Sequence, residues 1–313
     1  MLSRVADNLY WMSRYLERAE HNARVMGVQL NLMLEQDPRS SDRRWLRVLA
    51  SLGHSGGVTE NSDPFTRAQT YALRSITGGI ASARENARQV REQISSEMWE
   101  HLNRLYHEVR RMEAAGLLYV QPLDFITVIV ESSHLVQGVT DSTMNHGEGW
   151  QFIQVGRFIE RAAAIARLLD VYFREFPASQ PMDSTEHMEW IGLLRSCTAF
   201  EAYCKVYTAD LRPDRVAEFL LLNNEFPHSV RFAADHLQRS LEAINAAAAS
   251  KRSARVAKIA GRLSAGLMFT PLEEVVARLA EFFADIQQQC ARIHTALYEV
   301  YITYPVEAAL ENS

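Results

Sequence analysis

A short pattern of charged residues occurs twice in this 313-residue chain. Residues 14–19 read Arg-Tyr-Leu-Glu-Arg-Ala, and residues 157–162, at an offset of 143, read Arg-Phe-Ile-Glu-Arg-Ala. The planar fork of an arginine binds carboxylates and phosphates through two parallel hydrogen bonds. A nearby glutamate is either its counter-ion or a carrier of protons. The repeated pattern therefore predicts ion pairs inside the fold or a seat for an anionic ligand.

The repeat indicates two copies of one amphipathic helix. Ala23 and Arg24 match Ala166 and Arg167 at the same offset. Because each helical residue advances about 100°, the apolar residues of each copy share one side and the charges share another. The charged stripe of the first copy, which Tyr10 borders, consists of Arg14, Glu17, His21 and Arg24. The charged stripe of the second copy consists of Arg157, Glu160 and Arg167.

Three interpretations of these charges remain open. A charged stripe can be a solvated helix face, but aromatic neighbours and the duplication itself argue against that. Buried arginines must be paired, so Glu17 and Glu160 can neutralise them and fix helix packing. Alternatively, the surplus of arginines receives a peptide carboxylate, an acidic metabolite or a phosphate. Acid–base catalysis by either glutamate is disfavoured, because neighbouring arginines lower a carboxyl pKa.

A third charged segment, residues 84–88, reads Arg-Glu-Asn-Ala-Arg beside an apolar helical seam. If its helix packs beside both duplicated helices, we expect it to form a third wall of the charged cluster. The candidate ion-pair or anion-binding residues are Arg14, Glu17, Arg18, Arg84, Glu85, Arg88, Arg157, Glu160 and Arg161, with Tyr10, Asn86, Glu97, Asn103 and Trp150 as supporting residues.

Other kinds of site find weaker support. Neither glycine-rich phosphate-binding motif is present, so neither familiar mode of ATP binding is expected. Glu131 and His134 form one Glu-x-x-His pair, but a di-metal site needs two. We therefore expect no metal or cofactor, and His134 as a hydrogen-bonded interior residue. The three cysteines fall on helix seams, where we expect buried, inert thiols: Cys197, Cys204 and Cys290.

The composition limits the class of protein. The 33 basic and 38 acidic residues leave a net charge of −5, which argues against a nucleic-acid partner. No apolar run is long enough for a membrane span, and no apolar signal segment precedes the first helix. Few, unpaired cysteines are typical of a reducing compartment, so we expect a cytoplasmic protein.

The periodicity predicts an all-α bundle of roughly ten helices. We expect one domain over residues 1–313, with possible sub-bundles 1–176 and 182–313 joined by a linker at 177–181. Six further expectations concern single helices. The first three predictions are a helix over 2–36, a helix over 64–75 with Asp63 as its cap, and a helix from 78 onward that is either continuous or broken at Ser95. The other three are a central, buried helix over 123–139 and single helices over about 183–210 and 271–304.

Several stretches resemble the alpha-E family, an uncharacterised bacterial all-helical domain named for its Glu-Arg motif. Together they are spread over most of the chain, which makes the resemblance specific. The similar stretches are residues 2–19, 83–88, 97–99 and 149–162, and residues 215–222 with Phe226 and Pro227.

The resemblance implies a context. Alpha-E genes lie beside, or are fused to, a circularly permuted ATP-grasp ligase, with transglutaminase-like and proteasome-like peptidases nearby. ATP-grasp enzymes join carboxylates to amines through acyl-phosphates. The expected function is thus an accessory or substrate-binding partner of such a ligase, with a peptide or amino acid as possible substrate. The alternatives are a peptide-modifying enzyme that uses the Arg/Glu cluster, and a purely structural scaffold.

Overall fold

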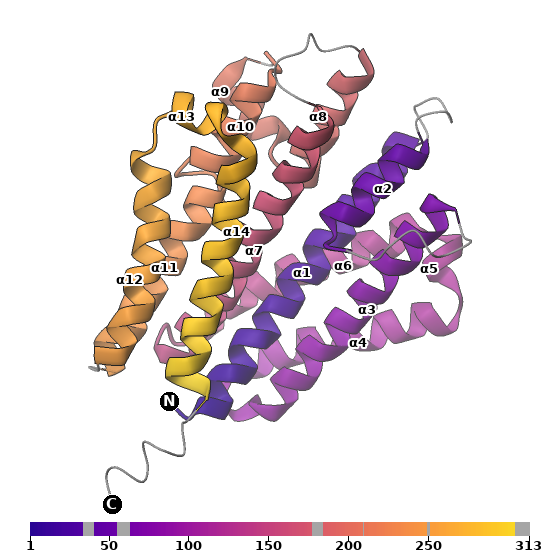
Figure 1. Ribbon diagram of the computed structural model, residues 1–313. Helices are drawn as coiled ribbons and strands as arrows, with labels where there is room; N and C mark the ends of the chain where they lie inside the picture. Colours follow the sequence, from indigo (N-terminus) through magenta and orange to yellow (C-terminus); the bar gives the residue numbers. More distant parts are fainter. Residues whose placement is uncertain (34–40, 55–62, 177–183, 209, 249–250, 304–313) are drawn as a thin grey trace, which may run out of the picture.

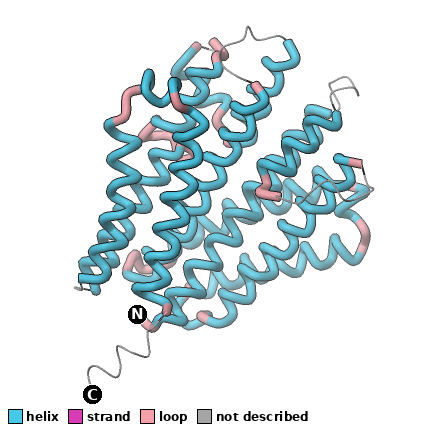
Figure 2. The backbone as a smooth tube through the Cα atoms, viewed as in Figure 1, coloured by secondary structure: helices cyan, strands magenta, loops and turns pink. Residues whose placement is uncertain are grey.

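A computed structural model describes residues 1–33, 41–54, 63–176, 184–208, 210–248 and 251–303. This part of the chain is helical throughout, with short connections and no strand (Figure 2). The predicted all-α class is confirmed. Fourteen α-helices are found in the described residues, more than the roughly ten expected, in part because two of the predicted long helices are broken and one short helix lies in a predicted connection.

The helices in chain order are α1 (Ser3–Met33), α2 (Ser41–Ser51), α3 (Pro64–Gln89), α4 (Ser96–Ala114), α5 (Leu117–Val120), α6 (Pro122–Thr143), α7 (Glu148–Glu175), α8 (Ser184–Ser196), α9 (Phe200–Tyr207), α10 (Pro213–Leu222), α11 (Val230–Ala248), α12 (Lys251–Phe269), α13 (Leu272–Ala277) and α14 (Leu279–Leu297). A short π-helical turn, Tyr298–Ile302, follows α14. None of these helices is both long and apolar enough to cross a membrane.

The two duplicated segments are the centres of α1 and α7, which lie at the middle of the molecule (Figure 1). α1 packs on α3, α6 and α7, and α7 packs in addition on α11 and α14. A continuous apolar core joins these helices. The predicted linker at 177–181 lies outside the described residues, but α7, which precedes it, packs against helices that follow it.

α1 and α7 touch at the level of the backbone. A Cβ atom at Gly156 would collide with the carbonyl oxygen of Tyr10. Next to this point the Ser13 hydroxyl donates a hydrogen bond of 2.6 Å to the carbonyl of Ile153. Ser13 and Gly156 are equivalent under the 143-residue offset, as are Tyr10 and Ile153. Small side chains at the contact therefore let the two copies cross closely and bring their charged residues within reach of each other.

The helix predicted to end near Ser75 does not end there. α3 starts at the predicted Asp63 cap, which accepts a hydrogen bond from the Thr66 amide, and runs unbroken to Gln89. Gly79 faces Ala19 and the carbonyl of Tyr15 on α1, so this glycine permits close packing rather than a break. The helix predicted from residue 78 onward is broken and not continuous, because a turn at Arg91–Gln93 separates α3 from α4.

The prediction of a central, buried helix over 123–139 was wrong. α6 buries one stripe of residues, but Leu123 and Leu135 are 36 % and 48 % exposed. α6 packs on α1, α4 and the short α5, so its opposite side faces solvent. High apolar content alone did not distinguish this helix from an interior one.

Two other predicted helices are interrupted. The helix expected over 183–210 breaks into α8 and α9 near Thr198, whose φ of +50° is incompatible with a continuing right-handed helix. The last helix breaks at Arg278, between α13 and α14. No proline or glycine stands at Thr198 or Arg278, so the sequence carried no conventional signal for either break.

Candidate functional site

The Glu-Arg pairs of the two copies exchange partners across the crossing. Glu17 accepts hydrogen bonds from Nε and Nη2 of Arg161 at 2.6 and 3.0 Å. Glu160 accepts hydrogen bonds from Nε and Nη2 of Arg18 at the same 2.6 and 3.0 Å. Because Glu17 corresponds to Glu160 and Arg18 to Arg161, the two ion pairs are related by an approximate two-fold axis.

Both glutamates are buried and ionised. Burial acts to raise the pKa of Glu160, but the charges and hydrogen bonds of Arg14 and Arg18 outweigh it and lower the pKa to about 2. Burial likewise opposes ionisation of Glu17, and Arg161, with smaller effects from Arg157 and Arg24, lowers its pKa below the usual range. These carboxylates are therefore counter-ions and do not carry protons near neutral pH.

Arg14 joins the pair at Glu160. Its Nε donates to Glu160 at 2.8 Å and its Nη1 donates to the Tyr10 hydroxyl at 3.0 Å. The same hydroxyl lies 2.7 Å from Nδ1 of His294 on α14. Burial raises the pKa of Tyr10 far above its ordinary value, so the phenol stays protonated. Glu160 is thus shared by two arginines and tied to α14.

Arg157, the counterpart of Arg14, has a poorer environment. Its Nη1 lies 3.4 Å from Gln154 and 3.9 Å from Asp141, and Asp141 also accepts a hydrogen bond from the Trp150 indole at 3.3 Å. Burial, together with the charge of Arg161, lowers the pKa of Arg157. A hollow of about 20 Å³ lies between Arg157 and Glu17, which is room for about one water molecule. This hollow is therefore too small for a ligand of the size of an amino acid.

The two equivalent arginines differ in exposure. The Arg161 side chain is 7 % exposed, whereas that of Arg18 is 37 % exposed. Within the described residues, Nη1 of Arg161 donates to the carbonyl of Pro227 at 3.0 Å, and Nη1 of Arg18 makes no hydrogen bond. The Arg18 side of the crossing is therefore the accessible one.

The third charged segment does not join this cluster. Arg84 donates to Asn103 on α4 at 3.1 Å and lies over the rings of Trp99 and Tyr106. Its expected role as a third wall was wrong, because the neighbours of its guanidinium are on α4. The other residues of the segment also bond locally: Glu85 with Arg88 at the surface, Asn86 with the carbonyl of Ser82, and Glu97 is exposed in the first turn of α4.

A second charged group, which the sequence pattern did not reveal, lies beside Glu17. Arg24 pairs with Glu20 one turn earlier on α1. Its terminal nitrogens also lie 3.4 Å from Nε2 of His228, 3.4 Å from the hydroxyl of Thr198, and 3.5 Å from Nε2 of His134. Residues from α1, α6 and the turns before α9 and α11 therefore meet around one guanidinium.

His134, expected in the interior, has a side chain that is 53 % exposed and lies 3.3 Å from the buried carboxylate of Glu20. Burial, followed by the charges of nearby arginines, lowers the pKa of both His134 and His228. Burial also lowers the pKa of Arg24 to about 10 and that of His21 to about 4. The three imidazoles are therefore neutral at physiological pH.

One signal could have pointed to this group. Glu20 and Arg24 have the i, i+4 spacing of a helical ion pair, next to the duplicated pattern. His228 and Thr198 lie in turns, and no spacing rule connects them to α1.

Cys197 and Cys290 are buried, and burial raises the pKa of each thiol to about 12, as expected for inert thiols. Cys204 is only partly buried. Within the described residues, no group of three or more histidine, cysteine or acidic side chains is arranged to hold a metal ion.

Comparison with known proteins gives a family and distant relatives. Residues 1–302 match Alpha-E, described as a predicted alpha-helical domain with a conserved ER motif. Uncharacterized proteins of Mycobacterium bovis and Mycobacterium tuberculosis are 24 % identical over 95 % of this chain. The chain spans only 36 % of the length of these relatives. No solved structure matches the chain significantly.

The two Glu-Arg dipeptides of the crossing, at positions 17–18 and 160–161, lie within the matched range and agree with the motif that gives the family its description. The chain belongs to the Alpha-E family.

Proposed function

We propose that this chain is a non-catalytic, substrate-seating partner of a cytoplasmic ATP-grasp-type ligase that joins carboxylates to amines. The family resemblance supports a link to such a ligase. In the mycobacterial relatives the matching region is about a third of a longer chain, which suits a module that works with other domains. The observation that carries the proposal is the partly exposed Arg18 side chain, of which only Nε and Nη2 are held by Glu160 within the described residues.

Arg18 is oriented to receive a carboxylate. Glu160 holds its Nε and Nη2, and the ring of Tyr15 lies 5.9 Å from its central carbon. The guanidinium plane is therefore fixed, while about a third of the side chain is exposed to solvent. A donor that is already ordered costs a ligand less conformational entropy than a mobile side chain does. The carboxylate of an amino acid or peptide is the group that such a donor fits.

The charge balance of the crossing favours an anionic ligand. Its arginines outnumber its glutamates: two arginines share Glu160, and burial together with the charge of Arg161 lowers the pKa of Arg157. Because the pKa values of Glu17 and Glu160 are both lowered, neither is suited to proton transfer. The cluster is thus better suited to holding a substrate than to transforming it.

The test uses the chain together with the ATP-grasp ligase that the family resemblance predicts to be encoded beside it. We expect the two proteins to co-purify and the ligase to use its carboxylate substrate at lower concentration when the chain is present. Arg18→Gln should abolish this effect. Arg88→Gln is the matched control, because Arg88 makes a similar two-pronged pair with exposed Glu85. Absence of a complex, with an unchanged ligase rate, would contradict the proposal.

One observation favours a second candidate, a peptide-modifying enzyme. His134 is a neutral, half-exposed imidazole beside the buried carboxylate of Glu20, the arrangement of a general base oriented by an acid. In that case the isolated chain turns over a peptide substrate, His134→Gln abolishes turnover, and Arg18→Gln does not. If neither variant changes any activity, the third alternative, a structural scaffold, holds.

A further inference from the structure

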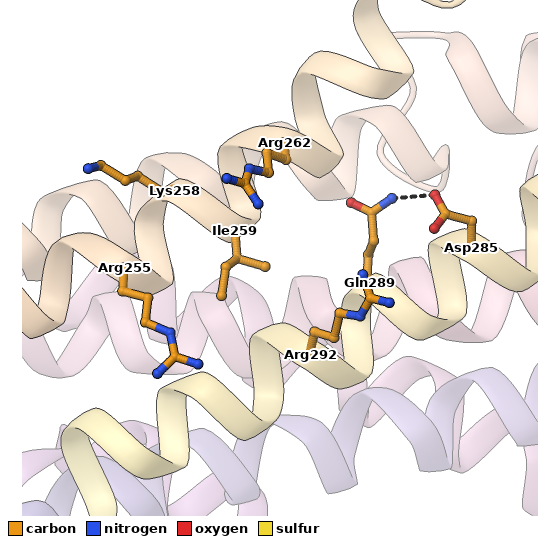
Figure 3. Close-up of a pocket in the computed structure, with 7 residues that line it drawn as sticks. All are labelled: Arg255, Lys258, Ile259, Arg262, Asp285, Gln289 and Arg292. Carbon is orange, nitrogen blue, oxygen red and sulfur yellow. Dashed lines mark hydrogen bonds between the residues drawn. The ribbon is translucent and has the colours of Figure 1, made fainter.

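A basic groove lies between α12 and α14, on the side of the molecule away from α3 and α4 (Figure 1). It has a volume of about 770 Å³, within the usual range for small-molecule sites. Figure 3 shows its lining. The residues that line the groove are Arg255, Lys258, Ile259 and Arg262 on α12, and Asp285, Gln289 and Arg292 on α14.

The groove is more basic than the chain as a whole. The chain as a whole is acidic, with 38 acidic and 33 basic residues. α12 nevertheless carries five basic residues in 19 and no aspartate or glutamate. Three of these basic residues line the groove at spacings of three and four, which places them along one face of the helix. Positive charge is thus concentrated on this helix.

Local carboxylates neutralise only part of this charge. Arg255 lies 3.2 Å from Glu299, and Asp285 is hydrogen bonded to Gln289. Within the described residues, Arg255 forms the salt bridge of this groove, and Lys258, Arg262 and Arg292 have no carboxylate within 4.0 Å. Two guanidinium groups and an ammonium group from facing helices therefore border one hollow in which Asp285 is the one carboxylate among the described lining residues.

We propose that this groove binds a soluble ligand with two or more linked phosphate groups. A phosphate presents up to two negative charges and three acceptor oxygens in a small volume, and arginine forks match it. Such a ligand neutralises several cations of the groove at once. The site lies on helices other than those of the Arg18 crossing, and the inference does not rest on the function proposed above.

The lining also argues against other anions. Ile259 is the only apolar side chain among the lining residues, and none of them is aromatic. A bound peptide is normally anchored by apolar side chains in pockets, and single-stranded nucleic acid by stacking on aromatic rings. The groove offers neither. We expect recognition of the phosphates with little dependence on the group attached to them.

The experiment measures binding of inorganic tripolyphosphate to the intact chain by calorimetry at low ionic strength. We expect saturable binding that weakens as salt is added. Arg262→Gln/Arg292→Gln should weaken it at least about tenfold, because each lost charge-assisted hydrogen bond contributes more than an ordinary one. Both side chains are exposed, so the variant should fold, which circular dichroism verifies.

The matched control is Arg110→Gln/Arg111→Gln, which removes the same charge from exposed positions on α4. It should bind as the unmodified chain does. A glutamate oligomer with the same charge as tripolyphosphate tests whether the groove prefers phosphates to carboxylates. No saturable binding of tripolyphosphate, equal binding by the groove variant, or tighter binding of the glutamate oligomer would each overturn the proposal.

Discussion

Glu17 of α1 and Arg161 of α7 form a buried, two-pronged ion pair, and the residues that correspond to them in the opposite copies, Glu160 and Arg18, form a second pair with the same donor atoms and distances. The duplication therefore joins the two helices, because each copy supplies the carboxylate for the arginine of the other.

The equivalent arginines should differ in their effect on stability. Arg161→Gln leaves Glu17 buried without its main partner, and we expect a loss of about 3–5 kcal/mol in the free energy of unfolding. Arg18→Gln should cost about 1 kcal/mol or less, because Arg18 is partly exposed and Arg14 still neutralises Glu160. Urea denaturation of both variants measures the difference. Equal losses would show that exposure does not distinguish the two pairs.

Removing both partners of the buried pair should do less harm than removing one. In Glu17→Met/Arg161→Met neither charge of the pair remains buried without its partner, and apolar side chains of similar length fill the space. We expect this double variant to lie within about 1 kcal/mol of the unmodified chain. The double-mutant cycle with the two single variants gives the coupling energy. A double variant as unstable as Arg161→Gln would mean that the hydrogen bonds themselves are required for folding.

The crossing should not tolerate a side chain at Gly156. In Gly156→Ala the new Cβ meets the carbonyl oxygen of Tyr10, and backbone atoms cannot move aside cheaply. We expect destabilisation of at least about 3 kcal/mol. Gly78→Ala is the control, since Gly78 is helical with nothing within 4 Å of its added Cβ, and it should stabilise by about 0.5–1 kcal/mol. Thermal unfolding compares the two.

Stability should fall in mild acid because of His21. Burial lowers the pKa of His21 from 6.5 to about 4, so the unfolded chain takes up a proton at higher pH than the folded chain does. Its contribution is present above pH 6.5 and is lost as the pH falls towards about 4, by about 3 kcal/mol. Glu160, with a pKa of about 2, contributes stability that is lost in a lower range, as the pH falls below 4.5.

The measurement compares the pH dependence of unfolding in His21→Gln and in His107→Gln, a variant of an exposed histidine on α4. The first should lose much of the slope between pH 6.5 and 4, and the second should keep it. An unchanged slope in His21→Gln would assign the acid sensitivity to other groups.

The buried cysteines should resist modification. Cys197 and Cys290 are buried and their thiol pKa values are raised to about 12, so little thiolate is present at neutral pH. A thiol reagent should label the native chain at Cys204 alone and all three cysteines after denaturation. Rapid labelling of Cys197 or Cys290 in the native chain would show that their helices open easily.

The sequence predicted the fold better than it predicted the site. Apolar periodicity identified the helices, and the repeated Arg-x-x-Glu-Arg located the ion pairs. It could not show which face of α3 meets α1, so Arg84 was assigned to the wrong group of neighbours. It also missed Glu189, which accepts from the buried Arg44 and Arg47, because such partners far apart in sequence meet only in the folded chain.

The approximate two-fold relation of α1 and α7 gives the crossing the form of an isologous interface, the kind normally found between identical subunits. In a symmetric dimer, one substitution changes both halves of such an interface at once. Here each half has its own codons, so the two can differ. Arg14 pairs with Glu160 while Arg157 does not pair with Glu17. A single chain can therefore keep one half closed for stability and open the other to solvent at Arg18.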